Sequence, residues 1–284
     1  MHNGLGTKIS EDYAPWLIVI HCFNHRLELA IKDALKGSFF DEINTMLLKL
    51  YYLYKKSLKR LRELRMFGEI YEKVVPKPAK ASGTRWIARK VNAMQIVLSN
   101  YGVFMAHLES LAQTDSQALK RNELVGYSKK WQQAKYLLHL ALYLDILQPL
   151  KVISLVMQQE THDPVKQLKH IRDFTWSMTK LSAFLEESID QTTARLTNFT
   201  KFLKDVVEED GTFTYQDVKL LNFNVSNESV KKSFNDIIND LTEKCSERFS
   251  RISKVILFLK VLISLIVNDG QKITPICQHS EKMR

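Results

Sequence analysis

Most of the chain carries the spacing of amphipathic helices. From Ile43 to Phe67 apolar residues recur every three or four positions and would cover one broad face of a helix. From Trp86 to Met105 the same spacing predicts another helix, and Gln113–Ser116 is predicted to be a turn. The segment Lys73–Gly83 contains two prolines, a serine and a glycine, which indicates an extended linker between these helices.

The segment Trp131–Gln159 is apolar on nearly every side, which predicts the central helix of a bundle. Pro149 lies inside it and predicts a kink or a break. Later in the chain the pattern predicts a helix that restarts at Pro164, an acidic turn at Glu208–Gly211, a brief extended segment at Thr212–Tyr215, and a last helix at Glu228–Phe249. The chain is therefore expected to be mainly helical.

One stretch near the N-terminus predicts a strand followed by a helix. Trp16–Cys22 is a short apolar run with β-branched residues, typical of a strand buried on both faces. Asn24 is predicted to be the N-cap of the next helix, whose apolar positions are Leu27, Ala30, Ile31 and Ala34. Cys22 and His25 would then lie at the carboxyl end of a sheet strand, where α/β folds usually place ligands.

The positive charge of the chain is concentrated in one block. The 284 residues carry a formal net charge of +10, and residues 49–90 alone hold 13 Lys/Arg against three Glu. Residues 186–247 are acidic instead, with 13 Asp/Glu against seven Lys/Arg. A concentrated positive charge favours an anionic partner, nucleic acid before membrane.

Cysteine content and the chain ends restrict the cellular setting. Three widely spaced cysteines argue against a disulfide framework and suit a reducing compartment. Met1–Asp12 is polar and has no hydrophobic region of a secretory signal. The apolar run Ile252–Val267 is short for a membrane span and contains Lys254 and Lys260, so no membrane partner is expected.

Two short motifs resemble the hAT superfamily of DNA transposases and their domesticated descendants. The first is Cys22-Phe23-Asn24-His25, which the sequence Arg-Leu-Glu-Leu-Ala follows at residues 26–30. The second is Thr84-Arg85-Trp86, after which hAT proteins insert a large helical domain. The resemblance covers roughly residues 14–250 and is strongest to vertebrate, host-adopted hAT proteins labelled as zinc-finger proteins or as a SUMO-protein ligase.

The resemblance implies an architecture in three parts. Residues 1–85 would be a partial ribonuclease-H-like α/β remnant with a basic helix, and residues 86–250 the helical insertion bundle. Residues 251–284 would be a divergent tail, because they do not resemble the family there. The first two catalytic carboxylates of the family would lie upstream of the stretch that begins at Pro15, and the last has no visible match, so the chain is expected to be a fragment of its parent domain.

Without those carboxylates the resemblance implies no catalytic residues and no cofactor, with Mg²⁺ expected only if the full parent domain were present. Cys22 and His25 remain as family motif residues. They either position DNA near the former active site or are structural, a buried cysteine at a strand end and a histidine in a capping turn. A zinc site would need two further ligands, and nucleophilic catalysis by Cys22 would need a base, and neither is apparent.

The sequence therefore predicts a catalytically inactive, nuclear, hAT-derived protein that binds DNA or acts as a scaffold. The candidate nucleic-acid-binding residues are Lys55, Lys56, Lys59, Arg60, Arg62, Arg85 and Trp86. The resemblance implies that Trp86 stacks on a base displaced from a duplex, although it could instead anchor its helix to the core. The basic face could likewise be a solvated helix surface. The alternatives are a protein-interaction module that does not bind nucleic acid and, less favoured, an active transposase or nuclease. The oligomeric state stays open.

Overall fold

The computed structural model describes residues 5–15, 22–81, 86–158, 164–187, 196–224 and 228–270. It is 78% helical, which confirms the prediction of a mainly helical chain. Its described strands form one small antiparallel sheet near residues 206–219 and do not lie at the N-terminus. Of the predicted strand Trp16–Cys22, all but Cys22 lies outside the described residues. The sheet in the described part of the chain is therefore β1–β3, and it is not part of the α/β segment predicted for residues 1–85.

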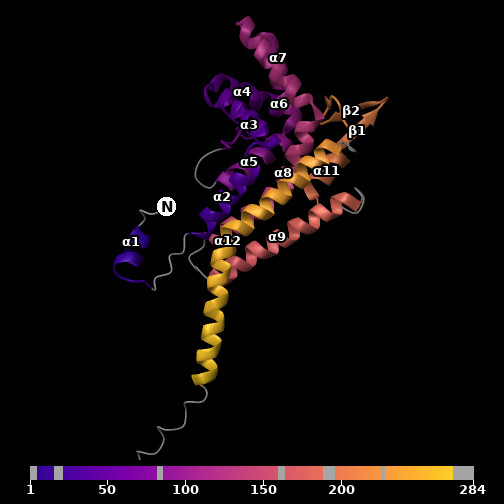
Figure 1. The fold of residues 1–284 in the computed structure, drawn as a ribbon. Coiled ribbons are helices and arrows are strands. Elements are labelled where there is room, and N and C mark those ends of the chain that lie inside the picture. Colours follow the sequence, from indigo (N-terminus) through magenta and orange to yellow (C-terminus); the bar gives the residue numbers. More distant parts are fainter. Residues whose placement is uncertain are drawn as a thin grey trace, which may run out of the picture.

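The elements follow one another as a long series of helices with one late interruption by strands (Figure 1). The helices are α1 (Leu5–Asp12), α2 (Phe23–Leu35), α3 (Phe39–Lys55), α4 (Leu58–Ile70), α5 (Trp86–Ser99), α6 (Tyr101–Thr114), α7 (Ala118–Gln132), α8 (Ala134–Met157), α9 (Pro164–Glu187), α11 (Thr197–Asp205) and α12 (Glu228–Gly270). The strands are β1 (Val206–Glu209), β2 (Thr212–Tyr215) and β3 (Val218–Lys219).

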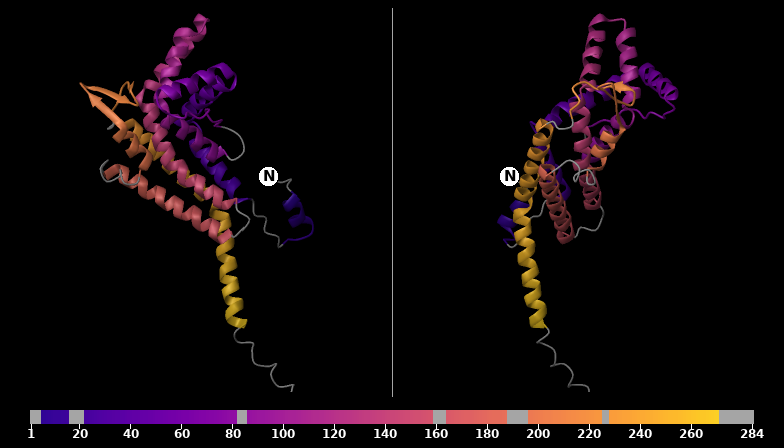
Figure 2. Two further views of the ribbon diagram at one scale, coloured as in Figure 1. Left: turned by 180° about the vertical axis from the view of Figure 1, so that it is seen from behind. Right: turned by 90° about the vertical axis from the view of Figure 1, so that its right-hand side faces the viewer.

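Helix α8 lies in the middle of the bundle. It packs against α2, α3, α5, α7, α9, α11 and α12, while α12 also packs along α2 and α9. Helices α3, α4, α6 and α7 form one end of the molecule, and the last part of α12 extends away from the opposite end (Figures 1 and 2). One hydrophobic cluster contains buried residues from Phe23 to Ile252, and α12 continues through residue 250. The proposed divisions at residues 85 and 250 stay predictions.

The all-round burial predicted for the central helix is confirmed. Five leucines of α8 have no exposed surface, Leu137, Leu140, Leu144, Leu147 and Leu150. The helix continues through Pro149, so the break is wrong and the kink, the other outcome predicted there, stays a prediction. Among the described residues α8 alone is long and apolar enough to cross a membrane, and 61% of its apolar window is buried inside the bundle. That burial is the environment of a core helix.

The pattern predicted as one helix over Ile43–Phe67 is two helices in the structure. Helix α3 ends at Lys55, and the side chain of Ser57 caps α4 by accepting a hydrogen bond from the Arg60 amide at 3.3 Å. Apolar spacing continues across this junction, which is why periodicity alone predicted no break. Most of the predicted apolar positions are correct, since Ile43, Met46, Leu47, Leu50, Tyr54 and Leu64 are all buried. Leu58, which the pattern placed on the same face, is instead 77% exposed at the start of α4.

The helix predicted over Trp86–Met105 is also two helices in the structure, and Gln216, which follows β2, contacts the junction between them. Helix α5 ends at Ser99 and α6 begins at Tyr101. The Gln216 side chain donates to the Leu98 carbonyl at 2.8 Å and accepts from the Gly102 amide at 3.2 Å. A Cβ atom at Gly102 would lie only 2.5 Å from the Gln216 carbonyl oxygen, so the close approach requires glycine.

Strands β1 and β2 pair through a two-residue turn. The extended segment predicted at Thr212–Tyr215 is confirmed as β2. The predicted turn at Glu208–Gly211 is shorter, because Glu208 and Glu209 belong to β1. Asp210 and Gly211 form the turn with φ values of 48° and 71°. Asp-Gly is a favoured sequence for such turns because both positions need positive φ.

The start of α2 differs from the prediction. Cys22, rather than Asn24, is its N-cap, and the structure gives no side-chain cap hydrogen bond there. Asn24 lies inside the helix and accepts a hydrogen bond from Ser154 Oγ of α8 at 2.7 Å. The Asn24 side chain, which the sequence predicted to cap α2, is therefore used in a contact between α2 and α8. The predicted apolar face is confirmed, since Leu27, Ala30, Ile31 and Ala34 are all buried.

The described part of the predicted linker, residues 73–81, has neither helix nor strand, as expected. It is nevertheless packed against the bundle, because Val75 and Ala81 belong to the buried core. The segment therefore holds a fixed path between α4 and α5.

Asp145 fastens α11 to the central helix. Its Oδ1 accepts from the Asn198 amide at 2.9 Å, and its Oδ2 accepts from the Phe199 amide at 3.0 Å. These amides belong to the first turn of α11, where a helix has unpaired donors. Burial raises the pKa of this carboxyl, while the hydrogen bonds from α11 oppose that shift. A buried carboxylate of α8 thus serves as the cap of another helix.

We expect Asp145→Ala to lower the free energy of unfolding by about 2 kcal/mol, because it leaves buried amides of α11 without acceptors. Urea unfolding of the full chain measures this change. The matched control is Glu123→Ala on α7, an exposed carboxylate that should have little effect. Equal midpoints for the wild type and Asp145→Ala would show that the cap is energetically unimportant.

Candidate nucleic-acid interface

Five exposed cationic side chains lie along the second half of α3, at its C-cap and in the first turns of α4. They are Lys49, Lys55, Lys56, Lys59 and Arg62, and they are called the basic surface below. Three of the lysine amines lie over tyrosine rings: Lys49 over Tyr127 at 5.0 Å, Lys55 over Tyr51 at 5.6 Å, and Lys56 over Tyr52 at 5.8 Å. Cationic groups interleaved with aromatic faces suit both the phosphates and the bases of a nucleic acid.

A hollow of about 410 Å³ lies within this surface. Residues of α3, α4 and α7 line it, namely Lys49, Tyr52, Leu53, Lys56, Arg60, Leu124 and Tyr127. The hollow thus combines amines with tyrosine rings in one concave place, which a uniformly solvated helix face would not provide.

Arg60 differs from the other candidates on this helix. Its guanidinium lies 3.0 Å from the Asp115 carboxylate, and the two side chains are only 25% and 13% exposed. The sequence grouped Arg60 with freely exposed cations, but here it joins α4 to the turn after α6. A role in contacting nucleic acid stays a prediction for Arg60, and a structural role is already evident.

A buried polar group supports the basic surface from below. Tyr54 of α3 and His107 of α6 share a hydrogen bond of 3.0 Å between the hydroxyl and Nδ1. Glu63 of α4 lies 3.6 Å from the other nitrogen of that imidazole. Burial lowers the pKa of His107, with Glu63 acting in the opposite direction. The three helices are thereby connected through polar side chains in addition to their apolar packing.

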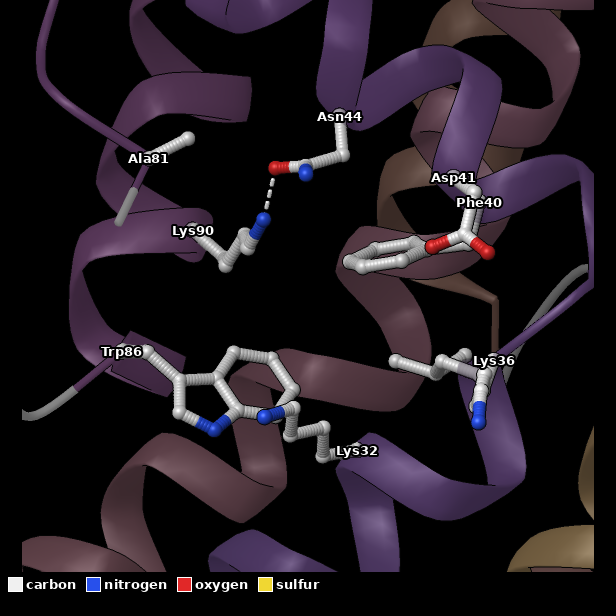
Figure 3. Close-up of a pocket in the computed structure, with 9 residues that line it drawn as sticks. Lys32, Lys36, Phe40, Asp41, Asn44, Ala81, Trp86 and Lys90 are labelled. Atoms are coloured by element: carbon white, nitrogen blue, oxygen red, sulfur yellow. Dashed lines mark hydrogen bonds between the residues drawn. The ribbon is translucent and has the colours of Figure 1, made fainter. Parts of the chain in front are cut away.

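Trp86 lies at a second concave site (Figure 3). This cavity, called the Trp86 cavity below, has a volume of about 340 Å³. Its lining comes from α2, α3, the end of the linker and α5, with the residues Lys32, Leu35, Lys36, Phe40, Asp41, Asn44, Ala81, Trp86 and Lys90. Trp86 is half-buried and packs against the edge of the core, so the indole both anchors α5 and forms a cavity wall.

Lys90 is the buried cation of this cavity. Only 7% of the residue is exposed, and its amine donates a hydrogen bond to Asn44 Oδ1. The amine lies 5.3 Å from the centre of the Phe40 ring and 6.0 Å from that of Trp86. Burial lowers the pKa of Lys90 to about 8.

Helix α3 connects the two concave sites. Asn44, Tyr51 and Lys55 are separated by seven and four residues, a spacing that places them along one stripe of the helix. Eleven residues of helix, from Asn44 to Lys55, span roughly 16 Å, or about five base steps of duplex DNA. This stripe therefore connects Asn44 at the Trp86 cavity with Lys55 of the basic surface, whereas Lys49 of the hollow lies roughly 120–140° around the helix from it.

The remaining predicted residues are Arg85, Cys22 and His25. Arg85 is not among the described residues. Cys22 and His25 are both exposed at the start of α2, so the expectation of a buried structural cysteine is wrong. Among the described residues no group of three or more His, Cys, Asp or Glu side chains could hold a metal ion.

Sequence reasoning missed most of the Trp86 cavity. Lys32 is in the last turn of α2 and Lys36 is the C-cap residue of that helix, while Lys90 is one turn after Trp86 on α5. The sequence places Trp86 and Lys90 on one helix face, but nothing local shows that this face meets the end of α2.

Comparisons with known proteins give no independent identification. No family model matches this chain, and no solved structure matches its fold. The resemblance to hAT proteins therefore stays a prediction from the two motifs.

Proposed function

We propose that this chain is a nuclear, hAT-derived protein that binds DNA without cutting it, either on its own or as a scaffold of a larger complex. The observation that carries the proposal is the stripe of α3 that joins an exposed cationic and aromatic surface to a cavity walled by Trp86. The excess of positive charge in residues 49–90, 13 Lys/Arg against three Glu, agrees with it.

In this proposal the two sites have different tasks. The basic surface contacts phosphates, which gives affinity without reading sequence. The Trp86 indole offers a flat face to a base that has left the duplex stack, as the hAT resemblance implies. Lys32 and Lys36, exposed at the same cavity, would hold the phosphates that flank that base.

A protein-interaction module is the second candidate, and one observation favours it. The outer face of α4 exposes Leu58, Met66 and Ile70, which are 77%, 62% and 75% exposed. Phosphate binding does not need these apolar side chains, whereas a protein partner would cover them. Failure of the DNA predictions below would make this candidate the better one. Metal-dependent strand cleavage would instead favour the third alternative, an active nuclease.

We expect the variant Lys55→Gln, Lys56→Gln, Lys59→Gln, Arg62→Gln to bind duplex DNA more weakly and with a smaller salt dependence. Each lost phosphate contact should reduce the slope of log K against log salt by about 0.9. Arg60 is left in place because its ion pair supports the fold. Fluorescence anisotropy at several salt concentrations measures both quantities.

The matched control replaces four cations of α9, Lys166→Gln, Lys169→Gln, Arg172→Gln, Lys180→Gln, which removes the same charge elsewhere. It should change the slope much less. If both variants lose affinity equally, binding follows net charge alone and the basic surface is not a site.

We expect Trp86→Ala to weaken binding to a duplex with one unpaired base by roughly 1–3 kcal/mol, the usual value of a base–aromatic stack. Binding to fully paired duplex should change less. The control is Trp176→Ala on α9, whose indole is 60% exposed and lies far along the chain from the cavity. A lower melting temperature for Trp86→Ala with unaltered DNA binding would identify Trp86 as a core anchor only.

A further inference from the structure

Lys90 is buried, unlike the exposed cations of the basic surface. Its amine is almost completely enclosed, yet it lines a cavity large enough for a small ligand. In the described part of the chain it forms no ion pair, and its hydrogen-bond acceptor is the neutral amide of Asn44. A structural lysine would normally extend its charge to solvent or pair it with a carboxylate.

The charges around Lys90 favour an anionic ligand. Asp41 of α3 is the carboxylate of the cavity lining, while Lys32 and Lys36 of α2 bring two further amines. Both of these lysines are exposed, and Figure 3 shows them on the side of the cavity opposite Asn44. The Phe40 and Trp86 rings supply flat apolar walls between the two groups of amines. A planar or sugar-like body with a phosphate at one end fits this division.

We propose that Lys90 is the reactive amine of a site for phosphate-bearing aldehydes, with Lys32 and Lys36 binding the phosphate and the Phe40 and Trp86 rings enclosing the body of the ligand. This goes beyond DNA binding, because it assigns a reversible covalent step to one side chain. The aldehyde can come from two sources, a small phosphorylated aldehyde or the open sugar of an abasic site in DNA.

The step is imine formation. The uncharged Nζ of Lys90 attacks the carbonyl carbon, and the carbonyl oxygen takes up a proton as the nitrogen loses one. The resulting carbinolamine releases water, and a carbon–nitrogen double bond remains. No oxidant or reductant is needed. Lys90 meets the requirement for an uncharged amine near neutral pH because burial lowers its pKa to about 8, against about 10.4 for an ordinary lysine.

The test uses the full chain and pyridoxal 5′-phosphate as probe, with borohydride to reduce the imine and peptide mass spectrometry to locate it. At low probe concentration Lys90 should be modified at least about tenfold faster than the exposed Lys129 and Lys166, because a larger fraction of its amine is uncharged. Its rate should rise with pH to a midpoint near 8. Inorganic phosphate should slow the reaction, and pyridoxal without phosphate should react more slowly.

Two variants keep the result interpretable. Lys90→Arg should abolish the fast modification. Lys32→Gln, Lys36→Gln changes only exposed side chains, so the fold should persist while the advantage of the phosphorylated probe disappears. Modification of Lys90 no faster than of exposed lysines, or an unchanged phosphate preference in the double variant, would overturn the proposal.

A second arm separates the two sources. A duplex with one aldehydic abasic site is trapped with borohydride, and a tetrahydrofuran analogue without the aldehyde serves as control. A cross-link at Lys90 identifies DNA as a source, whereas fast labelling by the small probe alone supports the site with a small-molecule ligand. Without fast labelling of Lys90 by the small probe the site is refuted, whichever way the DNA arm turns out. The small-probe arm does not depend on DNA binding, so its outcome is independent of the proposed function.

Discussion

The structure depends on the burial of α8. A helix with apolar side chains on every side must be surrounded, and each fully buried leucine contributes about 1.5–3 kcal/mol relative to exposure. Seven other helices contact α8, from α2 near one end of the sequence to α12 near the other. Asp145 shows how far this helix organises its neighbours, because a carboxylate buried on α8 caps the first turn of α11. The position of α3, and with it the candidate interface, follows from the same packing.

Periodicity predicted most of the helices and many of their buried faces, because these features depend on nearest turns. It did not predict α1 or α7, and it ended the last helix at Phe249 whereas α12 continues to Gly270. It did not predict the junctions, since those depend on residues far away in sequence. Gln216 occupies the α5–α6 junction from the β-hairpin, and the Leu221 carbonyl accepts from the Ala134 amide at 2.9 Å where α7 gives way to α8. Only the Ser57 cap had a local cause that the sequence could have revealed.

The candidate interface was likewise predictable only in part from the sequence. Cations at exposed helical positions could be predicted, and Lys55, Lys56, Lys59 and Arg62 are indeed exposed. The pairing of Arg60 with Asp115 could not, because 55 residues separate them. Lys90 belonged to the basic block by composition, yet its amine is buried between Phe40 and Trp86. Residue type gave the charge, and the three-dimensional packing decided whether that charge faces solvent, a carboxylate or an aromatic cavity.

In the proposed function one ligand spans α3 from the Trp86 cavity to the basic surface. Hydrogen–deuterium exchange of the full chain with and without a duplex containing one unpaired base tests it most directly. We expect slower exchange at the end of α2, along α3, at the start of α4 and in the first turns of α5, with β1 and β2 unchanged. Slower exchange confined to the β1–β2 hairpin or to α9 at saturating DNA would contradict this proposal.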